Sequence, residues 1–346
     1  MRAVILAGGE GTRLRPLTEN RPKPLVPIAG KPCIRYAINS LTNAGIRNLI
    51  VTTGYLSHKV IAQAGDGSHW GSTIIYSVEE QAMGTAGAVK KVEGFLDDTF
   101  IVVSGDLLTD VSLSNLVSFH KNRHAVATMA LTSVENPCEY GIVGLDEEGR
   151  ITRFKEKPTP SQVFSNMINA GIYILEPEVL DLVPKNRIFD FSKDLFPILL
   201  KEDEPLYGRR VRGLWMDIGR PADLIRANIE VAKREGGPKT LGGRKFKGPI
   251  ILGKDVKIAK TATIEGACYL GEGCQIVGSS KVIDTAVHPN AKIDSAFVQE
   301  SIVLEGAYIA PGSKVTECII GEDSVVSKKA VIHNTVVNDN TIVKGR

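Results

Sequence analysis

Ala3-Val-Ile-Leu-Ala-Gly-Gly-Glu-Gly-Thr-Arg-Leu-Arg-Pro-Leu17 begins as a short apolar strand and runs directly into a glycine-rich turn. The glycines at positions 8, 9 and 11 allow the backbone to approach a phosphate or a base, and their N–H groups can cradle an anion. Arg13 adds a fixed positive charge. A dinucleotide-binding fingerprint would need a third glycine where Leu14 stands, and the Gly-Lys-Ser/Thr ending of a Walker A loop is absent. On the glycines alone, an anion-binding loop and a plain strand-to-helix turn are equally supported.

Beyond this turn, short β-branched runs alternate with amphipathic stretches as far as residue 235. Alternating strands and helices are typical of crossover connections, which build a mixed, mainly parallel sheet. We therefore expect one α/β domain over residues 1–235, closed by a helix at 225–234. The other expected elements are strands at 3–7, 48–53, 72–76, 100–104, 125–131 and 170–175, and helices at 33–44 and 58–64.

The periodicity changes after residues 236–248, a segment rich in glycine that we predict to be a linker. A period of six follows, which predicts a parallel β-helix over residues 249–346. In such a fold each short strand contributes one inward aliphatic side chain, and the coils stack on one another. An alternating β-sandwich would instead need turn signals about every eight to twelve residues. The period is carried by Leu252, Ile258, Ile264, Leu270, Ile276 and Val282, after which it continues with register shifts.

The composition is that of an ordinary globular protein: 346 residues, 43% hydrophobic and 23% charged, or roughly two domains of about 150 residues. A net charge of +3 gives no whole-chain signal for nucleic acid or an anionic membrane. The run Ala3–Ala7 is too short for a signal-peptide core, and no stretch reaches the about 18 apolar residues of a spanning helix. Five cysteines without a C-x-x-C pair argue against a disulfide framework. We expect a cytoplasmic protein with free thiols and no nucleic-acid or membrane partner.

Further motifs follow the glycine-rich turn, beginning with Arg21-Pro-Lys-Pro-Leu25. Together they resemble the nucleotide-sugar pyrophosphorylase family, enzymes that join a nucleoside triphosphate to a sugar 1-phosphate. The resemblance implies a Rossmann-like nucleotidyltransferase domain, and a hexapeptide-repeat tail, a left-handed parallel β-helix, is a familiar appendage of that family. The segments 164–175 and 214–219 look especially like the mannose-1-phosphate guanylyltransferase branch. The remaining motifs are Gly84–Gly87, Ser104–Asp106, Tyr140–Gly141, Phe154–Pro158, Asn169–Gly171 and Trp215–Gly219 with Pro221.

Nucleotidyl transfer brings a triphosphate and an attacking phosphate together at the α-phosphorus, so the site needs cations. The resemblance implies that Arg13 and Lys23 hold the reacting phosphates and that Asp106 and Asp217 bind Mg²⁺. These four are the expected catalytic residues. Asp106 follows the strand expected at 100–104, at the edge where open α/β sheets bind ligands, whereas the local sequence of Asp217 also fits a turn or cap. No histidine or cysteine cluster has zinc spacing, so Mg²⁺ or a similar hard ion is the expected cofactor.

A pair of carboxylates, Glu79 and Glu80, favours GTP as the nucleotide. Guanine presents two neighbouring donors, N1–H and the 2-amino group, and a carboxylate accepts both, whereas a uracil or thymine edge suits a glutamine. The alternative is that both glutamates are solvated charges at the end of a strand. The nucleotide-binding residues that the resemblance implies are Leu6, Gly8, Gly9, Gly11, Thr12, Arg13, Glu79, Glu80, Gly84 and Asp106.

The sugar phosphate is expected to contact Lys23, Gly141, Glu156, Lys157 and Asn169. The resemblance implies hydrogen bonds from Glu156 and Asn169 to sugar hydroxyls, a backbone contact from Gly141 and a charge contact from Lys157. Taken singly, these residues also fit a surface charge, a turn amide and a hairpin glycine. Glucose and mannose differ by inversion of one hydroxyl, and only the branch resemblance favours mannose 1-phosphate.

Three other functions are compatible with parts of the sequence. A glucose-1-phosphate uridylyl- or thymidylyltransferase would use the same residues, and a regulatory paralogue would bind nucleotide sugar without turnover, although the four expected catalytic residues are intact. The β-helix could carry acyltransferase chemistry with His288 or His333 as base, but a lone histidine in a repeat is more often a corner or surface residue. Because the ends of stacked coils are open, we expect a homo-oligomer paired through the β-helix.

Overall fold

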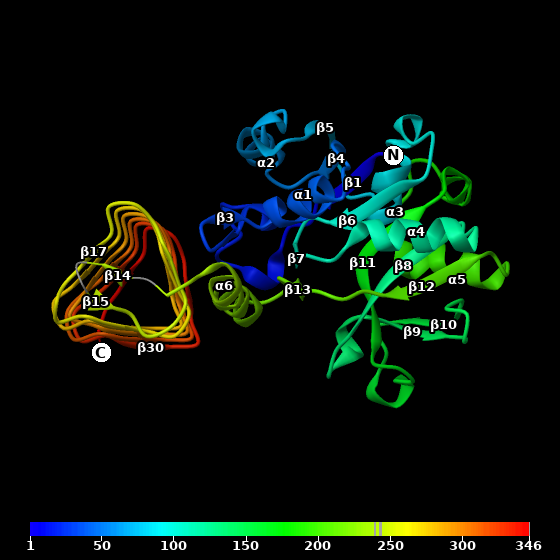
Figure 1. The fold of residues 1–346 in the computed structure, drawn as a ribbon. Coiled ribbons are helices and arrows are strands. Elements are labelled where there is room, and N and C mark those ends of the chain that lie inside the picture. Colours follow the sequence, from blue (N-terminus) through cyan, green and yellow to red (C-terminus); the bar gives the residue numbers. More distant parts are fainter. Residues whose placement is uncertain (239, 242–243, 346) are drawn as a thin grey trace. The chain divides into compact units, whose positions relative to one another are not determined.

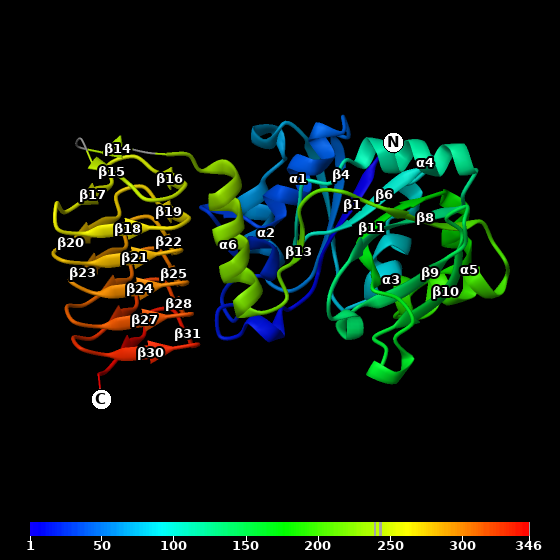
Figure 2. The ribbon, with the colours of Figure 1, turned by 60° about the horizontal axis from the view of Figure 1, so that its bottom comes forward.

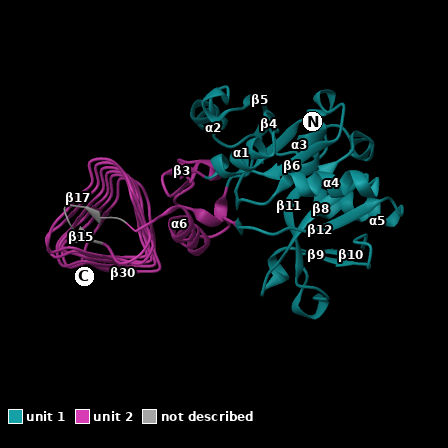
Figure 3. Cartoon of the chain, in the orientation of Figure 1, with its two compact units in different colours: residues 1–10, 33–216 teal, residues 11–32, 217–346 magenta. Residues whose placement is uncertain are grey.

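The computed structural model describes residues 1–238, 240–241 and 244–345. It contains two compact units, residues 1–10 with 33–216 and residues 11–32 with 217–346 (Figure 3). The division passes through the glycine-rich turn, so Gly8 and Gly9 belong to the first unit and Gly11 to the second. The predicted linker, 236–248, includes residues 239, 242 and 243, which lie outside the described residues, so the predicted domain boundaries stay a prediction.

A nine-stranded mixed sheet forms the centre of the first unit (Figure 1). On one side of it, β5, β4, β1 and β6 pair in parallel in that order, so their carboxyl ends lie along one edge. On the other side, β11 runs antiparallel to β6, β8 and β9, and β10 pairs with β9. The bounds are β1 Ala3–Ala7, β4 Asn48–Thr53, β5 Thr73–Val78, β6 Phe100–Ser104, β8 Ala127–Ser133, β9 Gly141–Leu145, β10 Ile151–Glu156, β11 Met167–Leu175 and β12 Leu206–Arg210, which pairs with β8.

Helices cover both faces of this sheet, with α1 and α4 on one side and α3 on the other (Figure 2). In α1 the buried residues Ile34, Ala37, Ile38 and Leu41 recur at the helical spacing, so one stripe faces the sheet. The helices at 33–44 and 58–64 and the six strands are confirmed to within a few residues. Among the described residues, no helix is long and apolar enough to cross a bilayer. The helices are α1 Ile34–Asn43, α2 Ser57–Ala64, α3 Gly84–Lys90, α4 Leu113–Arg123 and α5 Phe196–Lys201, of which α3, α4 and α5 were not predicted.

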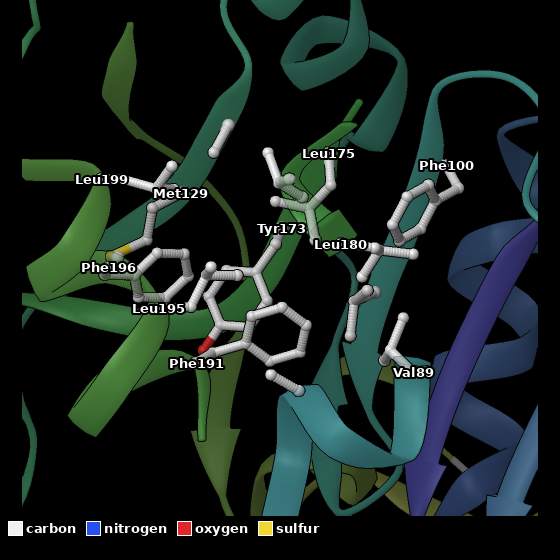
Figure 4. Packing of buried hydrophobic residues seen from close by; sticks show 14 of the residues in the cluster. Val89, Phe100, Met129, Tyr173, Leu175, Leu180, Phe191, Leu195, Phe196 and Leu199 are labelled. Atoms are coloured by element: carbon white, nitrogen blue, oxygen red, sulfur yellow. The ribbon is translucent and has the colours of Figure 1, made fainter. Parts of the chain in front are cut away.

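An aromatic cluster forms part of the core on the α3 side of the sheet (Figure 4). The ring of Tyr173 on β11 lies 5.1 Å from that of Phe191 and 5.0 Å from that of Phe196, between ring centroids. Phe100 on β6 and Met129 on β8 belong to the same buried cluster. Edge and tilted aromatic contacts add about 0.5–1.5 kcal/mol each beyond burial. The cluster therefore anchors the segment around Phe191 against the sheet, and with it the polar residues on either side.

The C-terminal part of the second unit is the predicted left-handed parallel β-helix, with three parallel sheets stacked along it (Figure 2). Its repeat aliphatic residues pair from coil to coil: Leu252 with Leu270, Ile258 with Ile276, and Ile264 with Val282. The first sheet is β16 Ile250–Leu252, β19 Cys268–Leu270, β22 Ala286–Val287, β25 Ile302–Val303, β28 Ile319–Ile320 and β31 Val336–Val337; the second is β17 Lys257–Ile258, β20 Gln275–Val277, β23 Lys292–Asp294, β26 Tyr308–Ile309, β29 Val325–Val326 and β32 Ile342–Val343; the third is β18 Thr263–Glu265, β21 Lys281–Ile283, β24 Phe297–Gln299, β27 Lys314–Thr316 and β30 Val331–His333.

The register shifts of the repeat have a simple structural cause. Leu252 pairs with Leu270, 18 positions later, but Leu270 pairs with Val287 and Val287 with Val303, which are 17 and 16 positions later. The later coils are shorter at a turn, and the inward residues stay in register.

Three cysteines lie buried in these coils, and all five cysteines are free, as predicted. Burial raises the pKa of the Cys268 and Cys274 thiols to about 12, so they remain protonated at neutral pH.

Helix α6, Pro221–Glu235, and the hairpin of β2, Pro27–Ile28, with β3, Lys31–Pro32, complete the second unit. The predicted helix at 225–234 lies inside α6, which begins with proline at a position where no helical N–H is needed. The buried Asn228 of α6 accepts a hydrogen bond from the N–H of Ala29 at 2.7 Å. This bond fixes the tip of the hairpin against the helix.

Candidate functional site

A cavity of about 280 Å³ lies at the carboxyl edge of the parallel strands in the first unit. Its volume is near the lower end of the range of small-molecule pockets, about 300–1,000 Å³. Six of the predicted nucleotide-binding residues line it. The lining residues are Leu6, Gly8, Gly9, Thr52, Glu79, Ala82, Gly84, Thr85, Ala88, Ser104, Asp106 and Asp190.

Two glycines of this cavity stand where a side chain would collide. Gly84 has a φ of +72°, and a Cβ there would lie 2.7 Å from the carbonyl oxygen of Phe189. A Cβ at Gly8 would lie 3.1 Å from Oε1 of Glu79. The motif glycines therefore allow the backbone and Glu79 to come close together at the mouth of the cavity.

The structure separates the two glutamates that were proposed to read the base. Glu79 is half-buried, its Oε2 accepts a hydrogen bond from the N–H of Met83 at 3.1 Å, and it lines the cavity. Burial raises the pKa of its carboxyl, while the Met83 N–H and Lys91 oppose the shift. Glu80 is exposed and lines a neighbouring hollow with Lys90 and other residues. Of these two glutamates, Glu79 lines the strand-end cavity and Glu80 does not.

Two polar residues of this cavity lie outside every motif that was singled out in the sequence. Thr52 on β4 is 1% exposed, and its hydroxyl has no hydrogen-bond partner among the described residues. Asp190 holds the first turn of α3, because its Oδ1 accepts from the N–H and the hydroxyl of Thr85 at 3.1 and 3.2 Å. Thr52 lies inside an expected strand, and its place at the strand end was the available signal. Asp190 lies in an irregular stretch with no motif, so nothing in the sequence marked it.

Asp106 stands where it was expected, directly after β6 and half-buried in the lining of the cavity. The backbone turns there, and the N–H of Gly105 donates to the carbonyl of Leu6 on β1 at 2.8 Å. A Cβ at Gly105 would lie 3.0 Å from that same oxygen. The Ser104-Gly-Asp106 motif therefore brings a carboxylate close to the end of the first strand.

Glu156 and Gly141 face each other as partners on β10 and β9. A Cβ at Gly141 would lie 2.8 Å from Oε2 of Glu156, so only glycine leaves this carboxylate its place. Burial raises the pKa of the Glu156 carboxyl. The charges of Lys157 and Lys193 lower this pKa, and the charge of Asp190 raises it. Lys157 has a φ of +43° and donates its N–H to the carbonyl of Tyr140 at 3.0 Å. Three of the predicted sugar-phosphate residues are thus grouped at one end of the hairpin.

Asn169 is part of a hydrogen-bond network on β11. Its Nδ2 donates to the hydroxyls of Tyr173 and Ser192 at 2.9 and 3.2 Å, and its Oδ1 accepts from the N–H of Gly171 at 2.9 Å. Both amide hydrogens are therefore used within the protein, and the remaining capacity is one lone pair on Oδ1. A sugar hydroxyl could only donate to Asn169. Ser192 also hydrogen-bonds Glu156, so the network extends to that carboxylate.

The second unit brings Arg13, Lys23 and Asp217 together. Nη2 of Arg13 lies 3.9 Å from Oδ2 of Asp217, and Nζ of Lys23 lies 3.6 Å from its Oδ1. Lys23 is 11% exposed along its side chain, whereas Arg13 is 54% exposed. Asp217 ends β13, Trp215–Asp217, just before α6. Sequence reasoning proposed all three as catalytic residues, and the fold places them in one cluster.

Two glycines make this cluster possible. Gly11 has a φ of +67°, and a Cβ there would lie 3.0 Å from the Cβ of Lys23. A Cβ at Gly219 would lie 3.0 Å from Oδ2 of Asp217 and 3.1 Å from Nη2 of Arg13. Thr12 begins the short 3-10 turn Thr12–Leu14, which carries Arg13. The arrangement offers two cations, one exposed and one nearly buried, that share the carboxylate of Asp217.

The described residues contain no group of three or more histidine, cysteine or acidic side chains arranged to hold a metal ion. Mg²⁺ is often held by one or two carboxylates together with substrate phosphates, so such a group is not required. A larger hollow, about 600 Å³, lies along residues 111–116 and 209–212, and none of its lining residues belongs to a sequence motif. We assign the candidate site to the smaller cavity, because six of the predicted nucleotide-binding residues line it.

Comparisons with known proteins identify the family of the chain. Residues 2–234 match the family described as nucleotidyl transferase, and residues 246–346 match the GMPPB C-terminal domain. A UTP–glucose-1-phosphate uridylyltransferase of Synechocystis is 34% identical over 92% of this chain and 87% of its own length. A mannose-1-phosphate guanylyltransferase catalytic subunit beta of Drosophila pseudoobscura is 34% identical over 99% of this chain and 89% of its own. The structure of HddC from Yersinia pseudotuberculosis complexed with GMP-PN superposes with a TM-score of 0.57 at 26% identity, covering 66% of this chain and 98% of that one.

Proposed function

The chain belongs to the nucleotidyl transferase family, and from that premise we propose that it transfers GMP from GTP to mannose 1-phosphate. The products are GDP-mannose and pyrophosphate. An oxygen of the sugar phosphate attacks the α-phosphorus of GTP, and the bond from that phosphorus to the β-phosphate oxygen breaks. Pyrophosphate leaves in line with the attacking oxygen.

The carboxylate of Glu79 in the strand-end cavity carries the choice of GTP. Its two oxygens can accept the N1–H and 2-amino donors of guanine, and one of them retains a lone pair beside the Met83 N–H. Guanylyltransferase relatives that span 99% of the chain, and a fold relative solved with GMP-PN, support the same base. Mannose 1-phosphate rests on the guanylyltransferase relatives alone.

The cations of the second unit supply the charge that the reaction needs. Lys23 and Arg13 would neutralise the triphosphate and the attacking phosphate, and Gly11 and Thr12 would contact the phosphates beside them. Lys23 is nearly buried against Asp217, so its ammonium is held in a defined place. Fixed charges in a partly dry site act more strongly than in water, because they need no rearrangement during the reaction.

The carboxylates fit a hard cation such as Mg²⁺. Asp106 and Asp217 offer oxygen ligands, and Asp106 is half-buried in the cavity proposed for the nucleotide. When bound, the ion would supply positive charge that neutralises the phosphates during the reaction. Asp217 also faces Lys23 and Arg13, so in the absence of the ion this carboxylate already has cationic partners.

The sugar phosphate is proposed to lie at the end of the β9–β10 hairpin. Lys157 would pair with its phosphate, and Glu156 would accept from sugar hydroxyls. Asn169 would accept from a third hydroxyl through Oδ1, because its amide hydrogens are engaged. Gly141 would contact the sugar through its backbone, and the absence of a Cβ there leaves room for the Glu156 carboxylate.

Pyrophosphate release tests the proposal directly. The wild-type protein is assayed with Mg²⁺ against every pairing of GTP, UTP, dTTP, ATP and CTP with mannose 1-phosphate and glucose 1-phosphate. We expect GTP with mannose 1-phosphate to be the best pair. Turnover with none of the pairs would contradict a catalytic role and favour a regulatory paralogue.

A glucose-1-phosphate uridylyltransferase is the second candidate function. It is favoured by the Synechocystis relative, which bears that name and matches 92% of the chain. Preference for UTP with glucose 1-phosphate in the same assay would select it. An acyltransferase role of the β-helix is less favoured, because His288 is 4% exposed and burial lowers its pKa to about 3.

Two further expectations belong to the same proposal. The open ends of the coil stack favour a homo-oligomer formed through the β-helix, and light scattering of the intact chain tests this. A cytoplasmic location is consistent with five free cysteines, since thiols persist in reducing compartments.

A further inference from the structure

The turns that follow the first sheet of the β-helix bring carboxylates into register on successive coils. The N–H of Asp323 donates to the carbonyl of Glu305 at 2.9 Å, and the N–H of Asn340 donates to that of Glu322 at 2.7 Å. Glu305, Glu322 and Asp339 therefore occupy equivalent positions on three coils. Stacked strands are about 4.8 Å apart, so these like charges oppose the stack unless a cation neutralises them.

Arg21, from the segment between the glycine-rich turn and the hairpin, is a cation at this column. Its Nη2 pairs with Oε1 of Glu322 and lies 3.9 Å from Oδ2 of Asp339. The side chains of Arg21 and Asp339 are each 12% exposed and that of Glu322 is 42% exposed, so Arg21 and Asp339 are largely buried and Glu322 lies at the edge of the contact. Removing one partner of a largely buried pair leaves the other charge uncompensated. Burial raises the pKa of the Glu322 carboxyl. The charge of Arg21 lowers this pKa, and the charges of Asp339 and Glu305 raise it.

Two other contacts fix the same segment to the coils. Oε2 of Glu19 accepts a hydrogen bond from Nδ2 of Asn338 at 3.1 Å. At the tip of the hairpin, a Cβ on Gly30 would lie 2.1 Å from the hydroxyl of Tyr269, so the backbone there is directly against the β-helix. Residues 19–30 therefore contact the β-helix through an ion pair, a hydrogen bond and a close packing contact.

The chain from Arg21 to Lys23 is stiff. Prolines stand at positions 22 and 24, and a proline ring restricts φ to about −65°, the value observed at position 22. Lys23–Leu25 form one 3-10 turn, closed by the N–H of Val26 donating to the carbonyl of Lys23 at 3.1 Å. With φ restricted at Pro22 and Lys23 held in a hydrogen-bonded turn, we expect a displacement of the Arg21 backbone to shift Lys23 as well.

We propose that Arg21, held by Glu322 and Asp339, is a positioning residue that sets the ammonium of Lys23 against Asp217, which makes the β-helix part of the catalytic scaffold. The inference rests on the proposed function, because Lys23 is assigned there to the reacting phosphates. A misplacement of about 1 Å in such a site can lower a rate by about 100-fold. The larger effect is expected in kcat, since the cavity of the first unit proposed for the base does not include Lys23.

The test compares the intact enzyme with the double variant Glu322→Gln/Asp339→Asn. We expect kcat to fall about 10- to 100-fold with KM for the nucleotide changed less than about threefold. Glu265→Gln is the matched control, because Glu265 is a partly exposed β-helix carboxylate paired with Lys281 and Lys247, away from the segment that carries Arg21 in the sequence. It should keep wild-type kcat. Wild-type kcat in the double variant, or an equal loss in the control, would overturn the proposal.

A charge exchange separates positioning from a general loss of fold. Arg21→Glu alone should lose activity as the double variant does, and Arg21→Glu with Glu322→Arg should recover at least about tenfold. No recovery in a variant that melts like the wild type would count against the ion pair. Hydrogen exchange at Leu25 and Val26 gives a readout without turnover, and it should be faster in the double variant. If the wild type releases no pyrophosphate with any substrate pair, the proposed function fails, and unchanged exchange would then overturn the anchoring as well.

Discussion

Lys23 and Asp217, which are far apart in the sequence, form an ion pair with Nζ 3.6 Å from Oδ1. The lysine comes from a 3-10 turn between two prolines, and the aspartate ends the strand before α6. Arg13 approaches the other oxygen of the same carboxylate at 3.9 Å. In the proposed reaction this cluster receives the phosphates, because it combines a fixed ammonium with an exposed guanidinium that can follow the substrate.

Replacing Lys23 with methionine should lower kcat by about 100-fold or more, because the charge on the reacting phosphates is lost. The fold should survive, since Arg13 still faces Asp217. Lys31→Met is the control, because Lys31 forms an exposed pair with Glu235 in the same unit. Steady-state pyrophosphate release and a thermal melt measure both effects. A Lys23→Met enzyme within twofold of the wild type would remove this residue from the mechanism.

Asp106→Asn should reduce turnover by about 100- to 1,000-fold, with the melting temperature nearly unchanged. The substitution keeps the size of the side chain and removes the charge proposed for the cation. Raising Mg²⁺ should recover part of the rate if the carboxylate binds the ion, and titration of the rate with Mg²⁺ measures this. An unchanged Mg²⁺ dependence would reject the assignment of Asp106 as a metal ligand.

Glu79→Gln should shift the nucleotide preference from GTP toward UTP or dTTP. The loss of the charged acceptor should lower kcat/KM for GTP by about 10- to 100-fold, since hydrogen bonds to a charged group contribute about 1.5–3 kcal/mol. Glu80→Gln is the control, because Glu80 is exposed and lies outside the cavity. An equal effect of both substitutions would mean that neither carboxylate meets the base.

Glu79→Gln should also stabilise the free enzyme at neutral and higher pH. Burial raises the pKa of Glu79, so the folded protein binds this proton more tightly than the unfolded chain does. The stability that this proton contributes is present below the pKa that Glu79 has in the unfolded chain. It is lost as the pH rises through the pKa that Glu79 has in the folded protein. Glu79→Gln removes the cost of the buried charge, so its melting temperature should exceed that of the wild type at pH 8. The difference should shrink toward pH 4, and a difference independent of pH would contradict this account.

Glu156→Gln should raise KM for the sugar phosphate about tenfold with little effect on KM for the nucleotide, because a neutral amide is a weaker acceptor for hydroxyls. Burial raises the pKa of Glu156, so this carboxylate is protonated at a higher pH than an ordinary glutamate. As the pH falls, the wild-type KM for the sugar phosphate should therefore begin to rise at that higher pH. The variant should show no such dependence. Initial rates from pH 5 to 8 measure both, and parallel profiles would exclude Glu156 from the sugar site.

The strand ends and the coils were predictable because each rests on a local pattern. Asp106 was predictable because it follows an apolar strand. Leu252 and Leu270 were predictable because they belong to a period of six, which stacks them on neighbouring coils. Asp190 was not predictable, since its position follows from the packing of an irregular segment. Thr52 had a signal in its place at the end of an expected strand, but its role also depends on which strands are neighbours. Arg21 was visible in its motif, but its partners depend on which turns of the β-helix face that segment. Such pairings are a tertiary property that no spacing along the chain records.

The ratio of kcat/KM for GTP to that for UTP, measured with mannose 1-phosphate on the wild-type enzyme, tests the central claim most directly. The carboxylate of Glu79 in the strand-end cavity predicts a ratio of at least about 10, equivalent to about 1.4 kcal/mol. A ratio of one or less would contradict the assignment of Glu79 to guanine and, with it, the proposed guanylyltransferase function.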